Sequence, residues 1–407
     1  MTDNSCAKCG ACTTVCPVYQ VTGQESLTAR GRLHLLEKID AGKQSQAYLD
    51  IFSKCLLCDA CHQACPRAIN LPKKVVESRH NFAKLTGQGS FAQSLVKGCL
   101  SHQRILASIG KFLQISKPLL DKLPASSGLR LKLGLSPANH SHQIPPKKTI
   151  PEQSSPDDSL KSVLFPGCLA RHLNWDITFA TSALVSRKDR GSPDIPPGQA
   201  CCGLAFYSSG NIEEARQLAR LNIAAFAETD VPIVVVCGSC YSHLTGYPAL
   251  LADDNTWSPR AIAFADRLRE LSAFLTDQSP SPTASTCADN RSSVKKRVVY
   301  HDPCHLRYGK GLKEAPRQLL NSLPWVELVE LANGSQCCGS GGLFNLAHPD
   351  ISEQITGQLI NDILAVTPDL VVTTCSGCLI QLRQQLTGVG SRTEVRHLSQ
   401  VLTNTTK

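Results

Sequence analysis

The chain has 407 residues, of which 42% are hydrophobic and 5% aromatic, and a net charge of +9. It contains no apolar run of 18 residues and no basic N-terminal region followed by an apolar stretch, so we expect neither a transmembrane helix nor a secretory signal. The 20 cysteines are then expected to be reduced metal ligands in the cytoplasm rather than disulfides, because thiolates are soft ligands for iron and zinc.

Residues 1–80 are predicted to form a ferredoxin-type domain, with two cysteine-rich loops flanking a helix from Arg32 to about Asp50. The loops read Cys6-x2-Cys9-x2-Cys12-x3-Cys16-Pro17 and Cys55-x2-Cys58-x2-Cys61-x3-Cys65-Pro66. This is the spacing of bacterial two-cluster ferredoxins, in which the fourth cysteine of each run ligates the other [4Fe–4S] cluster. The predicted ligands are Cys6, Cys9, Cys12 and Cys65 for cluster 1 and Cys16, Cys55, Cys58 and Cys61 for cluster 2.

Zinc is the alternative metal for these loops. A structural zinc site needs four ligands, commonly from two Cys-x2-Cys pairs, and it requires neither the third step of the run nor the Cys-Pro ending. Both runs have both features, so the spacing favours iron–sulfur clusters. A zinc-bound structural protein remains a third interpretation of the whole chain.

Residues 81–160 are predicted to be a basic, partly helical arm that ends in a linker. From Arg67 to Lys148 the chain carries 14 lysines and arginines against two acidic residues, a net charge of +12. Apolar residues recur at helical spacing from Ile105 to Leu123, with Pro118 expected to break the helix. The bias indicates an anionic partner surface or membrane headgroups rather than nucleic acid, and the alternative is a solvated connector.

The rest of the chain repeats itself. Five cysteines recur at offsets of 136 or 138 residues, which indicates an internal duplication. The two sets are Cys168, Cys201, Cys202, Cys237 and Cys240, and Cys304, Cys337, Cys338, Cys375 and Cys378. We place the two modules at residues 161–275 and 297–405, with a Ser/Pro/Thr-rich connector between them.

Each module is predicted to be an α/β unit with a mainly parallel sheet. In both, an apolar strand-like run precedes the first cysteine, a helical pattern follows the Cys-Cys-Gly turn, and a second β-rich run precedes the last cysteine pair. The cysteines thus fall after the strands, where parallel sheets collect ligands. The predicted fold class is an α-rich ferredoxin-like domain followed by a duplicated α/β domain.

Each five-cysteine set has more thiolates than one cubane cluster or one zinc ion uses. Gly203 and Gly339 are expected to let the backbone turn tightly beside the double cysteine. An unusual cluster, or a site in which irons share a sulfur, would use all five thiolates. The alternatives are a plain cluster, zinc or no metal in one or both modules.

The order of two ferredoxin runs and two Cys-Cys-Gly modules resembles the heterodisulfide reductase family. That family includes iron–sulfur subunits of glycolate oxidase, anaerobic glycerol-3-phosphate dehydrogenase and lactate-utilisation complexes. Within it the resemblance is greatest to glycolate oxidase iron–sulfur subunits. The segments that carry it are Cys16-Pro17-Val18-Tyr19, Arg30-Gly31-Arg32-Leu33, His301-Asp302-Pro303-Cys304, Cys337-Cys338-Gly339-Ser340-Gly341 and Val395-Arg396-His397-Leu398. The first module departs from the pattern, since Leu204-Ala205 follows Gly203.

The resemblance implies an electron-transfer subunit of a 2-hydroxyacid dehydrogenase complex, most closely one that oxidises glycolate to glyoxylate. A flavin-binding catalytic subunit would take electrons from the substrate, and this chain would pass them towards quinone from the inner face of the cell membrane. It also implies that the modules can hold noncubane clusters. The alternatives are a D-lactate or glycerol-3-phosphate dehydrogenase complex, or a reductase acting on a disulfide or quinone.

Several single residues have two interpretations. Arg30 and Arg32 begin the predicted first helix or interact with anionic cluster sulfurs. His301 and His305 flank Cys304 and could tune a cluster or donate a proton, although such histidines are more often structural.

The glycine-rich segment at Gly339 lacks the full nucleotide-binding pattern, so we expect no flavin or nicotinamide site in this chain. Cys99 and Cys287 fall outside every pattern.

Overall fold

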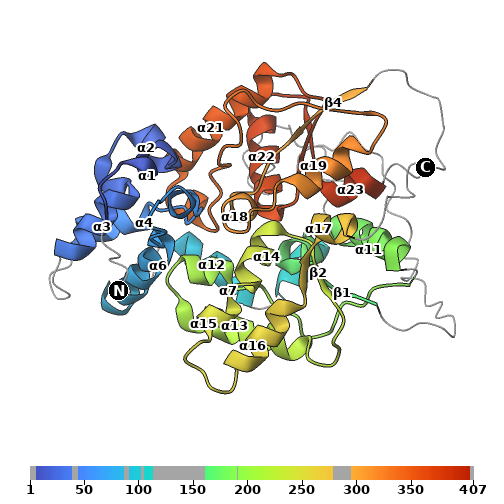
Figure 1. Ribbon diagram of the computed structural model, residues 1–407, viewed down its shortest axis with the longest axis horizontal. Helices are drawn as coiled ribbons and strands as arrows, with labels where there is room; N and C mark the ends of the chain where they lie inside the picture. Colours follow the sequence, from blue (N-terminus) through green and yellow to red (C-terminus); the bar gives the residue numbers. More distant parts are fainter. Residues whose placement is uncertain are drawn as a thin grey trace.

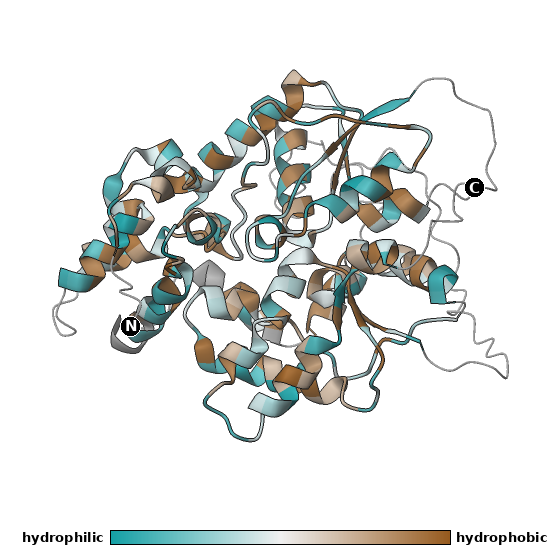
Figure 2. Ribbon diagram, viewed as in Figure 1, coloured by the Kyte–Doolittle hydropathy of each residue, from teal (hydrophilic) through white to brown (hydrophobic). Residues whose placement is uncertain are grey.

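The computed structural model describes residues 6–38, 45–86, 91–101, 105–112, 161–189, 191–277 and 295–403. Figure 1 shows an N-terminal helical unit at the left, the first cysteine module below and the second module above. Brown, hydrophobic ribbon is concentrated in the strands at the centre of each module (Figure 2). In the described part of the chain, no helix has both the length and the apolar character needed to cross a bilayer.

The N-terminal unit is helical throughout. Its elements are α1 Ala11–Thr14, α2 Pro17–Thr22, the 3-10 turn η1 Glu25–Leu27, α3 Ala29–Lys38, α4 Gln46–Ser53, α5 Ala60–Gln63 and α6 Leu71–Thr86. The next helix, α7 Phe91–Ser101, packs against the core of the first module. The predicted single helix from Arg32 to Asp50 is wrong. A new helix begins at α4, because Ser45 is extended and its hydroxyl accepts a hydrogen bond from the backbone N–H of Tyr48.

The two cysteine loops have the same backbone. Non-glycine residues adopt left-handed φ values at Lys8 (54°) and Leu57 (56°), each two residues after the first cysteine of its run. Two residues later, Gly10 (81°) and Asp59 (64°) are left-handed as well. The sharp changes of direction turn each loop around one centre, as a run of cysteines at steps of three requires.

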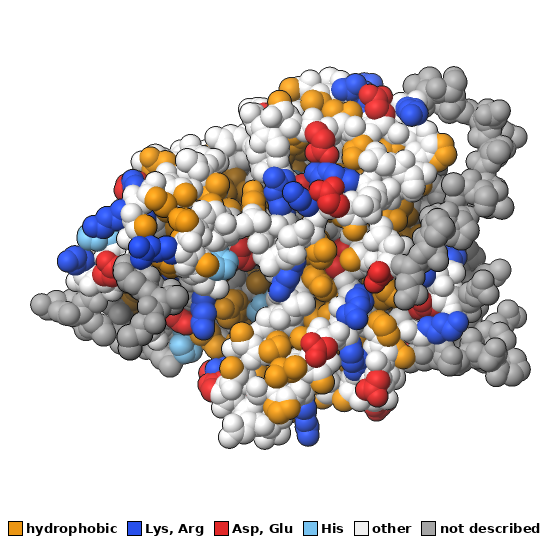
Figure 3. All heavy atoms as spheres, viewed as in Figure 1, with side chains coloured by type: hydrophobic (Ala, Val, Ile, Leu, Met, Phe, Trp, Pro, Cys, Tyr) orange, Lys and Arg blue, Asp and Glu red, His pale blue; other side chains and the backbone are white. Residues whose placement is uncertain are grey.

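The predicted arm is seen only in part. Helix α6 continues through residue 80, the predicted domain boundary, and residues 105–112 are helical. Leu100 and Leu106 are buried in the core of the first module. Pro118, Lys117, Lys122 and the linker lie outside the described residues, as does most of the basic segment. On the face shown in Figure 3 the described lysines and arginines are interspersed with acidic residues.

The first module is a parallel sheet covered by helices. Its elements are β1 Val163–Phe165, α10 Gly167–His172, α11 Trp175–Asp189, α12 Leu204–Ser208, α13 Ile212–Ala225, β2 Ile233–Val235, α14 Gly238–Leu244, α15 Tyr247–Leu250, α16 Ser258–Asp266, β3 Leu268–Glu270 and α17 Leu271–Thr276. The strands pair in the order β1-β2-β3, with Phe165 opposite Val235 and Val235 opposite Glu270. Strands β1 and β2 are apolar and buried along their whole length, which explains their place in the core, whereas β3 buries Leu268 and the carboxyl group of Glu270.

The second module repeats this plan. Its elements are β4 Lys296–Tyr300, α18 Cys304–Arg307, α19 Glu314–Asn321, β5 Val326–Leu328, α20 Phe344–Ala347, α21 Pro349–Ala365, β6 Leu370–Thr373, α22 Ser376–Gly388, β7 Glu394–His397 and α23 Leu398–Thr403. The strands are parallel in the order β5-β4-β6-β7. In the first module a single bridge between Val163 and Asp194 takes the place of β5. The predicted duplicated α/β fold is confirmed.

The two modules pack through reciprocal contacts. Helix α11 of the first packs against α23 of the second, and α19 of the second packs against α17 of the first. Near the centre of this interface the N–H of Gly238 donates to the carbonyl of Thr374 at 2.8 Å. A Cβ at Gly238 would lie 2.6 Å from Leu306, so only glycine lets α14 approach α18 this closely.

The Cys-Cys-Gly turns offer a matched pair of substitutions. Both Gly203 (φ 92°) and Gly339 (φ 74°) are left-handed, but a Cβ at Gly339 would lie 2.6 Å from Oγ1 of Thr356, whereas at Gly203 the nearest atom is 3.4 Å away. We expect Gly339→Ala to lose more unfolding free energy in urea than Gly203→Ala, because it adds a clash to the roughly 1–3 kcal/mol of backbone strain. Equal losses would contradict the packing around Gly339.

Candidate metal centres

The predicted cluster 1 thiols converge on one cavity. The wall of this cavity contains all four predicted ligands, Cys6, Cys9, Cys12 and Cys65. Cys61 and Arg30 also line it. Burial raises the pKa of Cys12, while a backbone hydrogen bond from Arg30 acts in the opposite direction. Arg30 thus faces this group of sulfurs, and its guanidinium also pairs with Glu25.

The predicted cluster 2 thiols are also neighbours. Burial raises the pKa of Cys61, and the charges of Cys55 and Cys16 raise it further. Burial likewise raises the pKa of Cys58, with added repulsion from Cys337 of the second module and from Cys61. The N-terminal unit therefore presents one of its thiols to a cysteine of the second module.

The remaining arginine of the first helix has a structural place. Arg32 is buried and donates to the backbone carbonyls of Leu27, Ile51 (3.1 Å) and Lys54 (2.7 Å). Its planar fork satisfies carbonyls of loops that lack regular partners. Arg32 therefore has a role that was not predicted, since it holds the loops in place, and its charge also favours the thiolate of Cys16, a predicted cluster 2 ligand. Arg30 lines the cavity of the cluster 1 cysteines.

The five cysteines of the first module come together after strands β1 and β2. Hydrogen bonds from the thiols of Cys168 and Cys202 lower the pKa of Cys201 although burial opposes this. Cys202 in turn is in hydrogen-bond contact with Cys240, and Cys240 with Cys237. Such a group of buried thiols is what a multi-iron centre requires, since the metal charge replaces the protons.

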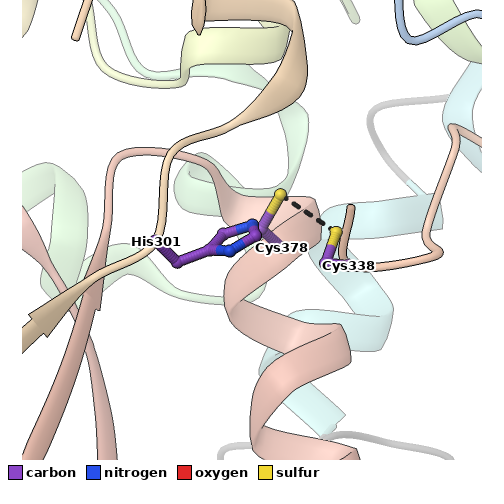
Figure 4. Close-up of side chains that lie close together, drawn as sticks. All are labelled: His301, Cys338 and Cys378. Atoms are coloured by element: carbon purple, nitrogen blue, oxygen red, sulfur yellow. Dashed lines mark hydrogen bonds between the residues drawn. The ribbon is translucent and has the colours of Figure 1, made fainter. Parts of the chain in front are cut away.

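The second module gathers its five cysteines in the same way. The sulfurs of Cys338 and Cys378 lie 3.2 Å apart, and their ligand atoms and that of His301 fall within 4.8 Å of one another (Figure 4). The hydrogen bond with Cys378 and the neighbouring His301 lower the pKa of Cys338 to about 5 against the effect of burial. Cys304 is in hydrogen-bond contact with Cys337.

The two sites touch at equivalent positions. Cys237 and Cys375 occupy the same place in the two modules, and their sulfurs are 3.8 Å apart. Hydrogen bonds with Cys237, Cys378 and Ser239 lower the pKa of Cys375 despite its burial. At the other end of the second site, Cys304 interacts electrostatically with Cys58. Thiols therefore extend from the N-terminal unit through the second module to the first.

The residues present fit iron–sulfur groups. Each site offers soft thiolates, most of them buried. Each also has a buried imidazole nitrogen without a hydrogen-bond partner among the described residues, Nε2 of His243 in the first and Nε2 of His301 in the second. Burial lowers the pKa of His243 to about 4, so the ring is neutral and can donate from one nitrogen only. Cluster sulfides accept such hydrogen bonds.

Comparison with known proteins agrees with this geometry. Residues 3–69 match the family described as 4Fe-4S dicluster domain, and residues 162–245 and 298–383 match that described as cysteine-rich domain. A probable glycolate oxidase iron-sulfur subunit of Bacillus subtilis (strain 168) is 29% identical over 98% of this chain and 93% of its own. Lactate utilization protein A of Geobacillus sp. (strain WCH70) is 34% identical over 60% of this chain and 99% of its own.

The chain belongs to the cysteine-rich-domain family of iron–sulfur subunits. The two family matches in the C-terminal part agree with the predicted duplication, and the dicluster match covers both ferredoxin runs. The uncharacterized protein YkgE of Escherichia coli (strain K12) is 30% identical over 57% of this chain and 98% of its own. Like lactate utilization protein A, it matches only part of this chain over almost its whole length.

Sequence analysis did not identify three residues that lie in or beside the cysteine sites. His243 lies three residues after Cys240 on α14, a helical spacing that places both on one face and could have been noticed. Ser239 lies 3.2 Å from the sulfur of Cys375 in the other module. Asp59 is partly buried and lies beside Gly309 of the second module, which no local pattern indicates. Cys99, outside every pattern, packs against the first module's core, and Cys287 lies outside the described residues.

Proposed function

We propose that this chain is the electron-transfer subunit of a flavin-dependent 2-hydroxyacid dehydrogenase complex, with glycolate as the favoured substrate. The observation that carries the proposal is a series of neighbouring thiols. Cys58 of the N-terminal unit interacts electrostatically with Cys304 and Cys337 of the second module, and the sulfurs of Cys375 and Cys237 join the second module to the first. Two [4Fe–4S] clusters, held by the four thiols assigned to each, would supply one-electron transfer. The ten module thiols would hold further iron–sulfur groups.

The chain's own residues suit this role. The N-terminal unit packs against both modules. Its Val18 and Leu56 share an apolar cluster with Phe344 and Ile355 of the second module. Its Arg79 donates a hydrogen bond to the carbonyl of Ser208 in the first module. Fixed seating keeps Cys58 beside Cys304 and Cys337. Most of the module cysteines are buried, which excludes water and favours electron transfer over side reactions. Substrate would be oxidised on a flavin-binding partner, and the basic segment would face that partner or an anionic membrane surface where quinone is reduced.

The test uses the chain with its flavoprotein partner. Glycolate, D-lactate and glycerol 3-phosphate would each be offered, and flavin reoxidation followed by rapid-mixing spectroscopy. Cys338→Ser removes one thiolate of the second site, so substrate should still reduce the flavin while reoxidation slows about tenfold or more. Cys99→Ser, at a half-buried cysteine outside both sites, is the matched control and should behave as the unaltered protein.

Two outcomes would contradict the proposal. Unchanged reoxidation in Cys338→Ser would take the second site off the electron path. Flavin reduction by D-lactate but not by glycolate would assign the complex to the lactate-utilisation type, for which the similarity to lactate utilization protein A is the supporting observation.

A further inference from the structure

One imidazole contacts a cysteine loop from each of the three units. His305 follows Cys304 in the first turn of α18 and is 8% exposed. Its Nε2 lies 3.2 Å from the carbonyl oxygen of Leu57, between Cys55 and Cys58 of the N-terminal unit. Its Nδ1 lies 3.1 Å from Oγ of Ser239, between Cys237 and Cys240 of the first module.

The contact with Leu57 holds a strained part of the cluster 2 loop. A non-glycine residue at a φ of 56° costs about 1–3 kcal/mol and persists only where neighbouring groups fix it. Because a carbonyl only accepts, Nε2 of His305 must carry the hydrogen and donate it to Leu57. Beside it, a Cβ at Gly309 would lie 3.3 Å from Oδ2 of Asp59, so the loop is closely packed on the second module.

The contact with Ser239 reaches the junction of the two module sites. Oγ of Ser239 also lies 3.2 Å from the sulfur of Cys375, which is 3.8 Å from that of Cys237. The hydroxyl has one hydrogen, and the Nδ1 of an imidazole protonated at Nε2 is an acceptor. His305 and Cys375 therefore compete for the Ser239 hydrogen.

We propose that His305 is a positioning residue with two effects. Through Leu57 it fixes Cys58 against Cys304, and through Ser239 it limits the hydrogen bond that the Cys375 sulfur receives. The purpose of both effects rests on the proposed electron-transfer function, although the contacts themselves do not. Hydrogen bonds to sulfur set reduction potentials, because a donor stabilises the extra negative charge of the reduced state.

The experiment uses the full chain, loaded with iron and sulfide without oxygen and without its partner. His305→Gln keeps a donor at the distance of Nε2, His305→Asn keeps an acceptor at the distance of Nδ1, and His305→Leu keeps neither. Ser239→Ala removes the hydroxyl. His34→Leu, at an exposed histidine of α3, is the control. Paramagnetic resonance measures the magnetic interaction between reduced centres, a redox titration measures midpoint potentials, and rapid reduction measures internal electron transfer.

His305→Leu should weaken the interaction between the N-terminal and second-module centres and slow transfer between them about 10–100-fold. It should also raise the module potential, since the Ser239 hydrogen is released to Cys375, whereas Ser239→Ala should lower it. His305→Gln keeps the donor to Leu57 and should restore the magnetic interaction and the transfer rate. His305→Asn keeps the acceptor for Ser239 and should restore the module potential. Iron content equal to that of His34→Leu shows that the sites have formed.

The opposite results would overturn the proposal. In one of them, His305→Leu has the same magnetic interaction and the same module potential as the His34→Leu control. In the other, His305→Leu and Ser239→Ala shift the module potential in the same direction. If the His305 variants lose iron, Ser239→Ala decides alone, and an unshifted potential refutes the sharing of its hydrogen. A wild-type chain that accepts no electrons from the flavoprotein would refute the proposed function but leave these partner-free results standing.

Discussion

Replacing Asp302 with asparagine is expected to cost about 3–5 kcal/mol of unfolding free energy, because it leaves a partly buried arginine without its buried counter-ion. The carboxylate accepts two 2.8 Å bonds from Arg317, one of 2.7 Å from Ser335 and a longer one from Arg307. This network joins the segment before Cys304 to the segment before Cys337, so iron bound by the second module should fall as well. Urea denaturation and iron analysis measure both effects.

The same arginine supplies the control. Glu330 also pairs with Arg317, at 2.7 Å, but its side chain is 60% exposed. Water screens such a pair, so Glu330→Gln should cost less than about 1 kcal/mol and leave the iron content unchanged. Comparable losses in the two variants would show that Arg317, rather than the burial of Asp302, determines the effect.

Acid should remove the Asp302 contribution in a defined range. Burial alone would raise the pKa of Asp302, but the hydrogen bonds from Arg317 and Ser335 and the charge of Arg317 outweigh it, and the pKa lies below its ordinary value. The stabilisation is thus complete above the unfolded pKa of about 4 and is lost as pH falls through the lower folded value. Asp302→Asn should abolish this part of the pH dependence.

Replacing Arg79 with methionine should detach the N-terminal unit. The guanidinium donates to the carbonyls of Phe52, Ser53 (2.8 Å) and Cys55 (2.7 Å) and to that of Ser208 in the first module. Burial lowers the pKa of Arg79 to about 10, so it stays charged at neutral pH. Each buried carbonyl left without a donor costs about 1–3 kcal/mol, which predicts a loss of about 3 kcal/mol or more.

The measurement is thermal unfolding together with the iron content of the full chain. Arg79→Lys keeps the charge but not the planar fork, and should recover only part of the loss. Cluster 2 should be affected more than cluster 1, because Arg79 binds the carbonyl of Cys55. Normal iron content and an unchanged unfolding temperature in Arg79→Met would show that the apolar contacts alone hold the N-terminal unit on the modules.

Much of the architecture could be predicted because it has a local signature. The strands before Cys168 and Cys304 are short apolar runs, and the constant offset of the cysteines revealed the duplication. The break between α3 and α4 was missed because no proline interrupts residues 32–50, whereas a serine cap decides where the second helix begins. The contacts between units could not be predicted, since Cys58 and Cys304 are 246 residues apart in sequence and meet only through tertiary packing.

The contact of Cys237 with Cys375 has a consequence for how the duplicated chain can behave. In a dimer of single modules, a cysteine meeting its own copy would lie on a twofold axis, and the two halves would be indistinguishable. Joining two copies behind a single N-terminal unit removes that equivalence, since only the second copy has Cys58 beside its cysteines and carries His305, which contacts the N-terminal unit. The fused pair therefore has a polarity that no symmetric dimer could have, because its two five-cysteine sites have different neighbours.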